Sequence, residues 1–241
     1  MGQALIEAVL ADSELSLASA VDVAGSSAIG RAVGGIKIAA DPGNIAQADV
    51  LLDFTRPEGT LAHLKLAKAM VIGTTGFTEE DKGQIAEAAQ RIAIVMAANF
   101  AVGVNATYKL AETAAKILGD DYDVEIVEAH HRHKVDAPSG TALHLGQIVA
   151  QAMARDLEKN AVFGRKGDLG ERKPKQIGFH AIRGGDIVGE HTVIFAGSGE
   201  RVEVTVRSQS RTTYAQGALR AVKFLKQRAP GLYGMADVLG L

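Results

Sequence analysis

The chain has 241 residues, of which 47% are hydrophobic and 22% carry charge, and its formal net charge is -2. These values are ordinary for a soluble globular protein, and they lack the basic field that a general nucleic-acid-binding surface requires. The chain has no cysteine, which excludes a disulfide framework and a cysteine-ligated metal. The charge-free stretch 92–108 is shorter than a membrane span, and the N-terminus lacks the basic region of a secretory signal. We therefore expect a cytoplasmic protein without membrane or nucleic-acid partners.

The first hundred residues alternate between helical segments and short apolar runs. Helices are predicted over residues 3–11, after Arg56-Pro57, after Thr78 as N-cap, and over residues 102–118. Strands are predicted at residues 15–22, 50–55, 69–77 (running into a Gly/Thr loop) and 91–100. Continuous apolar strands that alternate with helices are typical of a parallel sheet covered on both faces, as in a Rossmann-like α/β domain.

The pattern changes after about residue 120. The alternation of YDVEIVEAH (122–130) predicts a half-exposed strand, and a helical stretch follows it. Three more strands are predicted, with Gly-containing turns between them, in KQIGFHAIRGG, EHTVIFAG and ERVEVTVRSQS. A final helix is predicted from residue 212. This second block predicts an α+β domain with an open mixed sheet, so the expected fold class is α/β with two domains.

The usual start of a dinucleotide-binding domain is not found in this sequence. A Rossmann unit needs a first strand and a glycine-rich turn before its first helix, and neither precedes Gln3. A parallel sheet without its central strand would leave two neighbouring strands unpaired. We therefore expect the strand and the turn to lie upstream of Met1; the alternative is a domain without its phosphate cradle.

Three strand ends in the first half carry candidate cofactor residues. Asp22 can accept hydrogen bonds from ribose hydroxyls. GTTGF (73–77) offers a close approach to the backbone beside polar groups, and AANF (97–100) offers backbone carbonyls and an aromatic ring. Each has an ordinary alternative, respectively a solvated acid, a strand-to-helix turn and a core phenylalanine.

The densest titratable chemistry lies in EAHHRHKVDAPSGTA (128–142), which holds three of the seven histidines. A metal site is disfavoured because consecutive strand residues point to opposite faces and no second cluster completes a ligand set. A nucleic-acid site lacks a basic stripe elsewhere, and a solvated charged loop is the non-functional alternative. An anion site fits better, because Ser139 or Thr141 can cap the following helix, whose free N–H groups favour a carboxylate. A histidine beside it can transfer a proton near neutral pH.

This run closely resembles the signature of the 4-hydroxy-tetrahydrodipicolinate reductase (dihydrodipicolinate reductase) family. Five further stretches resemble that family in the same order: DFTRPEGT, VIGTTGF, AANFAVGVN, AIRGGDIVGEHTV and TTYAQGALRA. The resemblance covers nearly the whole chain. It implies NAD(P)H-dependent reduction of a small cyclic dicarboxylate on the diaminopimelate route to lysine, by a homotetramer.

The resemblance also implies roles for individual residues. His130 is similar to the family's catalytic acid/base, and Lys134 to its proton donor. The substrate-binding positions correspond to His131, Ser139, Gly140 and Thr141. The cofactor-binding positions correspond to Met1, Asp22, Arg56, Gly73, Thr74, Thr75, Ala97, Ala98, Asn99 and Phe100. Val23 stands where the family often has arginine, which favours NADH over NADPH, and no metal is implied.

In the implied organisation, residues 1–100 form the dinucleotide-binding domain, the C-terminal helix 212–241 packs back on it, and residues 101–211 form the substrate-binding and oligomerisation domain. We expect domain closure to bring cofactor and substrate together, with loss of a hydroxyl as water, hydride addition at ring C4, and proton transfer by His130 or Lys134. The segments 35–38 and 63–69 look shorter than in the family. The alternatives are a non-catalytic nucleotide-binding module and a different small-molecule dehydrogenase.

Overall fold

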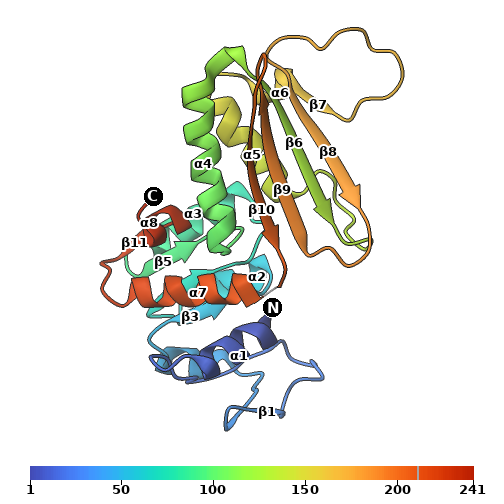
Figure 1. Cartoon of the computed structure of the whole chain (residues 1–241). Coiled ribbons are helices and arrows are strands. Elements are labelled where there is room, and N and C mark those ends of the chain that lie inside the picture. Colours follow the sequence, from blue (N-terminus) through green and yellow to red (C-terminus); the bar gives the residue numbers. More distant parts are fainter. Residues whose placement is uncertain (211) are drawn as a thin grey trace. The chain divides into compact units, whose positions relative to one another are not determined.

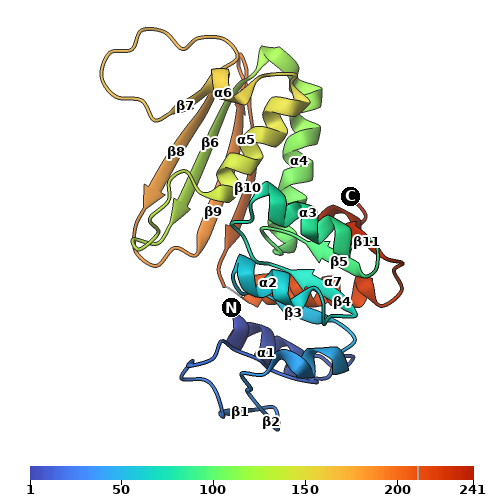
Figure 2. The same cartoon turned by 180° about the vertical axis from the view of Figure 1, so that it is seen from behind.

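The computed structural model describes residues 1–210 and 212–241 and is drawn from two sides in Figures 1 and 2. The chain divides into two compact units: unit 1 contains Met1–Val102 and Thr212–Leu241, and unit 2 contains Gly103–Arg211. Arg211, at the expected domain boundary, lies outside the described residues. Unit 1 is thus discontinuous in sequence, and the chain of unit 2 is inserted into it.

Unit 1 is built on a four-stranded parallel sheet with strand order β11-β5-β4-β3. Its strands are β3 (Leu51–Asp53), β4 (Ala69–Ile72), β5 (Ala93–Met96) and β11 (Gly231–Tyr233). Its helices are α1 (Gly2–Ala11), α2 (Pro57–His63), α3 (Glu79–Ala88), α7 (Thr212–Leu225) and α8 (Met235–Leu239). Comparison of Figures 1 and 2 shows α7 on one face of this sheet and α2 and α3 on the other.

Successive residues of the central strands fill two separate cores, one on each face of the sheet. Val71 of β4 packs with Leu5 of α1 and with small residues of α7, whereas its neighbour Met70 packs with Ile85 of α3. Because both faces are buried, these strands contain continuous apolar runs, as the sequence predicted. Thr78 caps α3 in a capping box, also as predicted.

The prediction of a strand over residues 15–22 is wrong. This stretch forms only an isolated parallel bridge between Val21 and Ala39. A strand is stabilised by hydrogen bonds along its length, and the described part of the chain offers this stretch a partner only at that point. The residues that follow form a hairpin and a 3-10 helix that were not predicted: β1 (Ala32–Val33), β2 (Ile36–Lys37) and η1 (Pro42–Gln47).

Unit 2 is built on a five-stranded mixed sheet with strand order β10-β9-β6-β8-β7. Strands β10, β9 and β6 pair antiparallel, whereas β6, β8 and β7 pair parallel. The strands are β6 (Asp123–His130), β7 (Ala161–Phe163), β8 (Ile177–Arg183), β9 (Gly189–Ala196) and β10 (Arg201–Ser208). The helices are α4 (Val102–Leu118), η2 (Gly119–Asp121), α5 (Gly140–Ala152) and α6 (Leu157–Asn160). The predicted α/β fold class, with a parallel and a mixed sheet, is confirmed.

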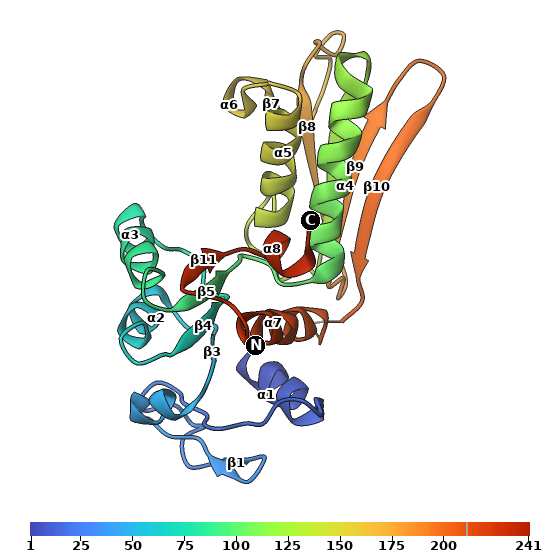
Figure 3. The ribbon, with the colours of Figure 1, turned by 90° about the vertical axis from the view of Figure 1, so that its left-hand side faces the viewer.

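The two faces of the unit 2 sheet differ. Figure 3 shows α4 and α5 side by side against one face. Val124 and Ile126 of β6 point into the core on this side, together with Phe179 and Phe195 of the neighbouring strands. The residues between them on β6 point to the opposite face, which no helix of unit 2 covers among the described residues. The alternating burial of β6 follows from this arrangement.

Candidate functional site

The basic run lies at one end of the unit 2 sheet. His130 ends β6, a loop follows, and Gly140 and Thr141 form the start of α5. Ser139 is the N-cap, and its Oγ accepts a hydrogen bond from the backbone N–H of Ala142 at 3.2 Å. A side chain at Gly140 would meet no atom within 4 Å. The space beside this first turn is therefore open, and a helix N-terminus favours an anion.

A buried carboxylate lies behind this loop. Glu128 is 1% exposed, and its Oε2 lies 2.6 Å from Nδ1 of His130. Its Oε1 accepts the backbone N–H of Ser139 at 3.1 Å, and each of its oxygens accepts a guanidinium N–H of Arg183 at 2.7 Å. Burial raises the pKa of Glu128, but the hydrogen bonds from Arg183 and His130 outweigh burial and hold that pKa below its ordinary value. Glu128 is therefore ionised at neutral pH.

The ring of His130 lies between Glu128 and a second histidine. His191 of β9 meets it edge-on, with ring centroids 5.1 Å apart, and Nε2 of His191 lies 3.0 Å from Oγ of Ser139. Burial lowers the pKa of His130, Glu128 opposes this, and the charge of Lys134 lowers it further, so that the pKa falls below its ordinary value. Burial and the nearby charge of His130 lower the pKa of His191 to about 4. Near neutral pH His191 is neutral, and His130 can accept a proton and return it.

Two further residues of the predicted substrate site lie on the loop. Nδ1 of His131 is buried and has no hydrogen-bond partner among the described residues. Nζ of Lys134 donates to the carboxylate of Asp136 at 2.8 Å, and its side chain is 20% exposed. The ring of His133 lies 6.2 Å from that of His131; like Arg132, His133 is exposed. The structure thus brings His130 and the helix start together around Glu128, with the charge of Lys134 acting on His130 and with His131 on the same loop.

The predicted cofactor residues of unit 1 follow the carboxyl ends of its parallel strands. Thr75 and Ala98, after β4 and β5, are exposed. Gly73 is needed for packing, since a Cβ there would come within 2.1 Å of the ring of Phe54. The ring of Phe100 is 2% exposed and packs against Phe54 at a centroid distance of 5.4 Å. Its ring is therefore part of the core, the alternative that the sequence left open.

A buried polar cluster, which we call the Asp53 cluster, supports the loops after β3 and β4. Oδ1 of Asp53 accepts hydrogen bonds from the hydroxyls of Thr55, Thr60 and Thr74 at 2.7–3.1 Å. Its Oδ2 lies 2.6 Å from Nδ1 of His63. Burial raises the pKa of Asp53, but the hydrogen bonds from His63 and the threonines outweigh burial and lower that pKa. The hydroxyl of Thr74 therefore points into the protein and anchors its loop.

The other predicted cofactor residues lie on their own turns. Asp22 is exposed and accepts hydrogen bonds from the N–H of Val23 at 2.8 Å and from the hydroxyl of Ser26 at 2.7 Å. Met1 is the N-cap of α1, and Arg56 is the exposed N-cap of α2. Ala97 follows β5 directly, and the amide oxygen of Asn99 accepts the N–H of Ala101 at 2.9 Å, which fixes the turn before α4.

Sequence reasoning did not single out Arg183, His191 or Asp53. The spacing of Glu128 and His130 on one strand was a usable signal, because residues two apart share a face. Arg183 and His191 gave no local signal, since only strand pairing places them opposite His130 and Glu128, respectively. Within the described residues, no group of three or more histidine, aspartate or glutamate side chains could hold a metal ion.

The fold and the site define a two-unit α/β protein whose first unit is Rossmann-like. A solved structure of a dipicolinate-bound dihydrodipicolinate reductase from Paenisporosarcina sp. TG-14 shares this fold, with a TM-score of 0.79 and 24% identity, over 98% of this chain and 94% of that one. A probable dehydrogenase from Thermotoga maritima shares it more distantly, with a TM-score of 0.59 and 12% identity, over 98% of this chain and 89% of that one.

Sequence comparison is more specific. The family description "Dihydrodipicolinate reductase, N-terminus" matches residues 1–100, and "Dihydrodipicolinate reductase, C-terminus" matches residues 103–239. A 4-hydroxy-tetrahydrodipicolinate reductase of Aromatoleum aromaticum is 60% identical over all of this chain and 92% of its own length. One of Burkholderia ambifaria is 58% identical over all of this chain and 96% of its own length. The chain belongs to the dihydrodipicolinate reductase family, which confirms the resemblance.

Proposed function

We propose that the chain reduces 4-hydroxy-tetrahydrodipicolinate to tetrahydrodipicolinate, with NAD(P)H as reductant and loss of water, on the diaminopimelate route to lysine. The observation that carries this proposal is the position of His130, which Glu128 links to the N-cap Ser139 of α5 and which feels the charge of Lys134. It occurs in a chain that is 60% identical to a reductase of that name. A catalytic enzyme is favoured over a non-catalytic module because the chain holds both proposed proton-transfer groups, His130 and Lys134, and the proposed anion-binding helix start.

The substrate proposal rests on charge and on the helix start. One carboxylate of the cyclic dicarboxylate binds at the start of α5, formed by Ser139, Gly140 and Thr141, where the N-terminus of a helix favours an anion. Lys134 supplies the opposite charge, and His131 lies on the same loop. Overall, one hydride and one proton enter and one water leaves. His130, at the end of β6, or Lys134, on the loop that follows, exchanges the proton.

The residues of unit 1 fit a dinucleotide. Exposed polar backbone at Thr75 and Ala98 follows neighbouring parallel strands, which is the edge where such cofactors bind. Asp22 offers carboxylate oxygens to ribose hydroxyls, and Arg56 offers a cation to phosphates. When bound, the nicotinamide supplies the hydride. We propose NADH as the preferred cofactor, since Val23, 73% exposed beside Asp22, gives no charge to hold a 2′-phosphate.

We propose that unit 1 is the cofactor domain and that unit 2 binds substrate and assembles a cytoplasmic homotetramer. The uncovered face of the unit 2 sheet supports this assembly, because no helix of unit 2 covers it among the described residues and Ile182 on that face is 52% exposed. Multi-angle light scattering of the purified chain measures its mass directly, and a monomer at micromolar concentration would contradict the tetramer. None of the described helices is long and apolar enough to cross a membrane.

The test is oxidation of NADH and of NADPH, followed by absorbance, with substrate generated in the cuvette by its synthase. The expected result is substrate-dependent oxidation with a higher kcat/KM for NADH. Omitting the synthase is the control for background oxidation. No oxidation of either cofactor by folded protein would leave a non-catalytic nucleotide-binding module as the better description.

A further inference from the structure

We propose that Glu128 and Arg183 are positioning residues that together orient His130 and set its proton affinity for catalysis. This inference rests on the proposed function, because it assigns partners to the histidine that exchanges the proton. Neither residue is assigned a contact with the substrate. They act through His130, from the side of its ring that carries Nδ1.

Strand register brings four side chains of the site together. On three neighbouring strands, Arg183 of β8 lies opposite His130, and His191 of β9 lies opposite Glu128. Glu128 and His130 are two residues apart on β6, so both side chains share the face that α5 covers. The four side chains therefore meet at one end of the sheet because of the pairing itself, and no flexible loop is needed to bring them together.

The carboxylate of Glu128 selects one tautomer of the His130 ring. Glu128 is ionised and can only accept hydrogen bonds, so the proton of the neutral ring must sit on Nδ1, 2.6 Å from Oε2. The other nitrogen, Nε2, is then left with a lone pair for proton transfer. Without a charged acceptor at position 128, both tautomers of the ring become accessible and the ring is free to turn.

Charged groups on neighbouring elements act on the proton affinity of His130. The charged and titratable groups that face His130 are Glu128 on its own strand, Arg183 on β8, His191 on β9 and Lys134 in the loop. Glu128 favours the protonated ring, whereas Arg183 and Lys134 disfavour it. Arg183 also donates to the backbone carbonyl of Asp136 at 2.7 Å, which ties the loop to the same carboxylate. Burial, together with the charges of Lys134 and Arg183, thus opposes Glu128 and keeps the pKa of His130 below its ordinary value.

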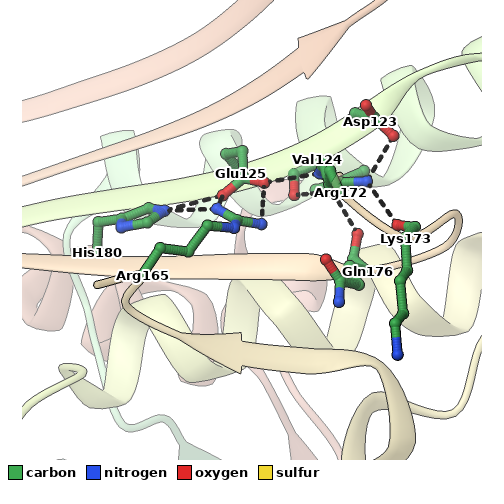
Figure 4. Close-up of polar contacts among 8 residues, drawn as sticks. All are labelled: Asp123, Val124, Glu125, Arg165, Arg172, Lys173, Gln176 and His180. Carbon is green, nitrogen blue, oxygen red and sulfur yellow. Dashed lines mark hydrogen bonds and ion pairs between the residues drawn. The ribbon is translucent and has the colours of Figure 1, made fainter. Parts of the chain in front are cut away.

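The same strand carries a matched control on its other face. Figure 4 shows Glu125 hydrogen-bonded to Arg165, Arg172 and His180, again a glutamate with arginines and a histidine. Residues 125 and 128 are three apart and point to opposite faces of β6. A change at Glu125 therefore removes a similar carboxylate from the same strand without touching His130.

The experiment titrates His130 by NMR of its ring nitrogens in the full-length protein and in the variants Glu128→Gln and Arg183→Gln. Removing Glu128's charge should move the titration to lower pH and mix the two tautomers. Removing Arg183's charge should move it to higher pH, and Arg183→Lys, which keeps the charge, should restore it. In the reductase assay, kcat of Glu128→Gln should fall about tenfold or more with KM for cofactor unchanged, within the ~10²–10⁴-fold worth of general acid–base catalysis.

Shifts of the His130 titration in opposite directions in the two variants indicate a positioning role. A purely structural role would lower the stability of both variants without moving the titration in opposite directions. Glu125→Gln should leave the titration of His130 in place. The proposal is overturned if both variants fold, by circular dichroism, and leave the titration of His130 unchanged, or if Glu125→Gln shifts it equally. If Glu128→Gln does not fold, the contrast between Arg183→Gln and Arg183→Lys decides alone. Absence of reductase activity in the unmodified protein would overturn the proposed function separately, because the titration needs no turnover.

Discussion

At the scale of single residues, His130 and Lys134 occupy different surroundings although they lie four positions apart. His130 is held against a buried carboxylate, whereas Lys134 pairs with Asp136 at the protein surface. We expect His130→Ala and Lys134→Ala each to lower kcat by roughly 10²–10⁴-fold, the usual worth of a positioned proton-transfer group. Cofactor affinity, measured by fluorescence titration with NADH, should stay within a factor of two or so, because these residues lie in unit 2. Full activity in either variant would refute its role.

Gly73 is required by packing in the structure. The ring of Phe54 occupies the space where a side chain at this position would lie, and a Cβ there would come within 2.1 Å of that ring. Gly73→Ala should lower the free energy of unfolding by about 1–3 kcal/mol, the usual cost of forcing extra volume into a packed site. Urea unfolding measures this change. Gly83→Ala, on α3 where a Cβ meets nothing within 4 Å, is the control and should be neutral or stabilising; equal losses in both variants would contradict the packing argument.

At the scale of elements, the Asp53 cluster joins the end of β3, the helix α2 and the loop after β4. Asp53→Asn removes the charge that His63 faces and leaves the threonine hydroxyls with a weaker acceptor. We expect unfolding to become easier by about 1–3 kcal/mol, the cost of an unsatisfied buried polar group. We also expect NADH to bind more weakly, because Thr74 loses its anchor. Asp49→Asn, at an exposed position, is the control and should change neither quantity. Unchanged NADH binding in Asp53→Asn would show that the Asp53 cluster does not support the cofactor loop.

How far the sequence predicted these elements depended on how local their causes are. Helix α4 was placed at its observed limits, Thr78 was identified as a cap from local chemistry, and Ser139 was one of two candidates for the cap of α5. The strand at 15–22 failed because a strand depends on distant partners as well as on its own apolar residues. The candidate site was found wherever its residues lie in one run, around His130, and missed where strand pairing supplies them, as with Arg183.

At the scale of the whole molecule, the ion pairs of Glu125 with Arg165, Arg172 and His180 should contribute to the acid sensitivity of the fold. Burial raises the pKa of Glu125, but Arg165, His180 and Arg172 outweigh it and bring that pKa from 4.5 to about 2. Because the folded-state pKa is the lower one, the stabilisation is complete above about pH 4.5 and is lost as pH falls toward 2. Linkage converts this difference into roughly 3 kcal/mol at neutral pH.

The measurement is urea unfolding of the native chain and of Glu125→Gln at pH 7 and at pH 3. The native chain should lose stability on acidification, and the variant should lose less, because it has no carboxylate to protonate at this position. Equal acid losses in the two proteins would show that other carboxylates carry the effect.

The insertion of unit 2 into unit 1 has a consequence for how the chain is made. During synthesis, β3, β4 and β5 emerge first, but α7 and β11, which cover and extend their sheet, come only after residue 211. At about 5–20 residues per second, the roughly 110 intervening residues take on the order of 5–20 s. For that interval an apolar sheet face and the open edge of β5 stay uncovered, and unit 2 receives its last strand, β10, before unit 1 receives α7 and β11. The yield of folded chains, more than their final stability, should therefore depend on translation speed across residues 103–211.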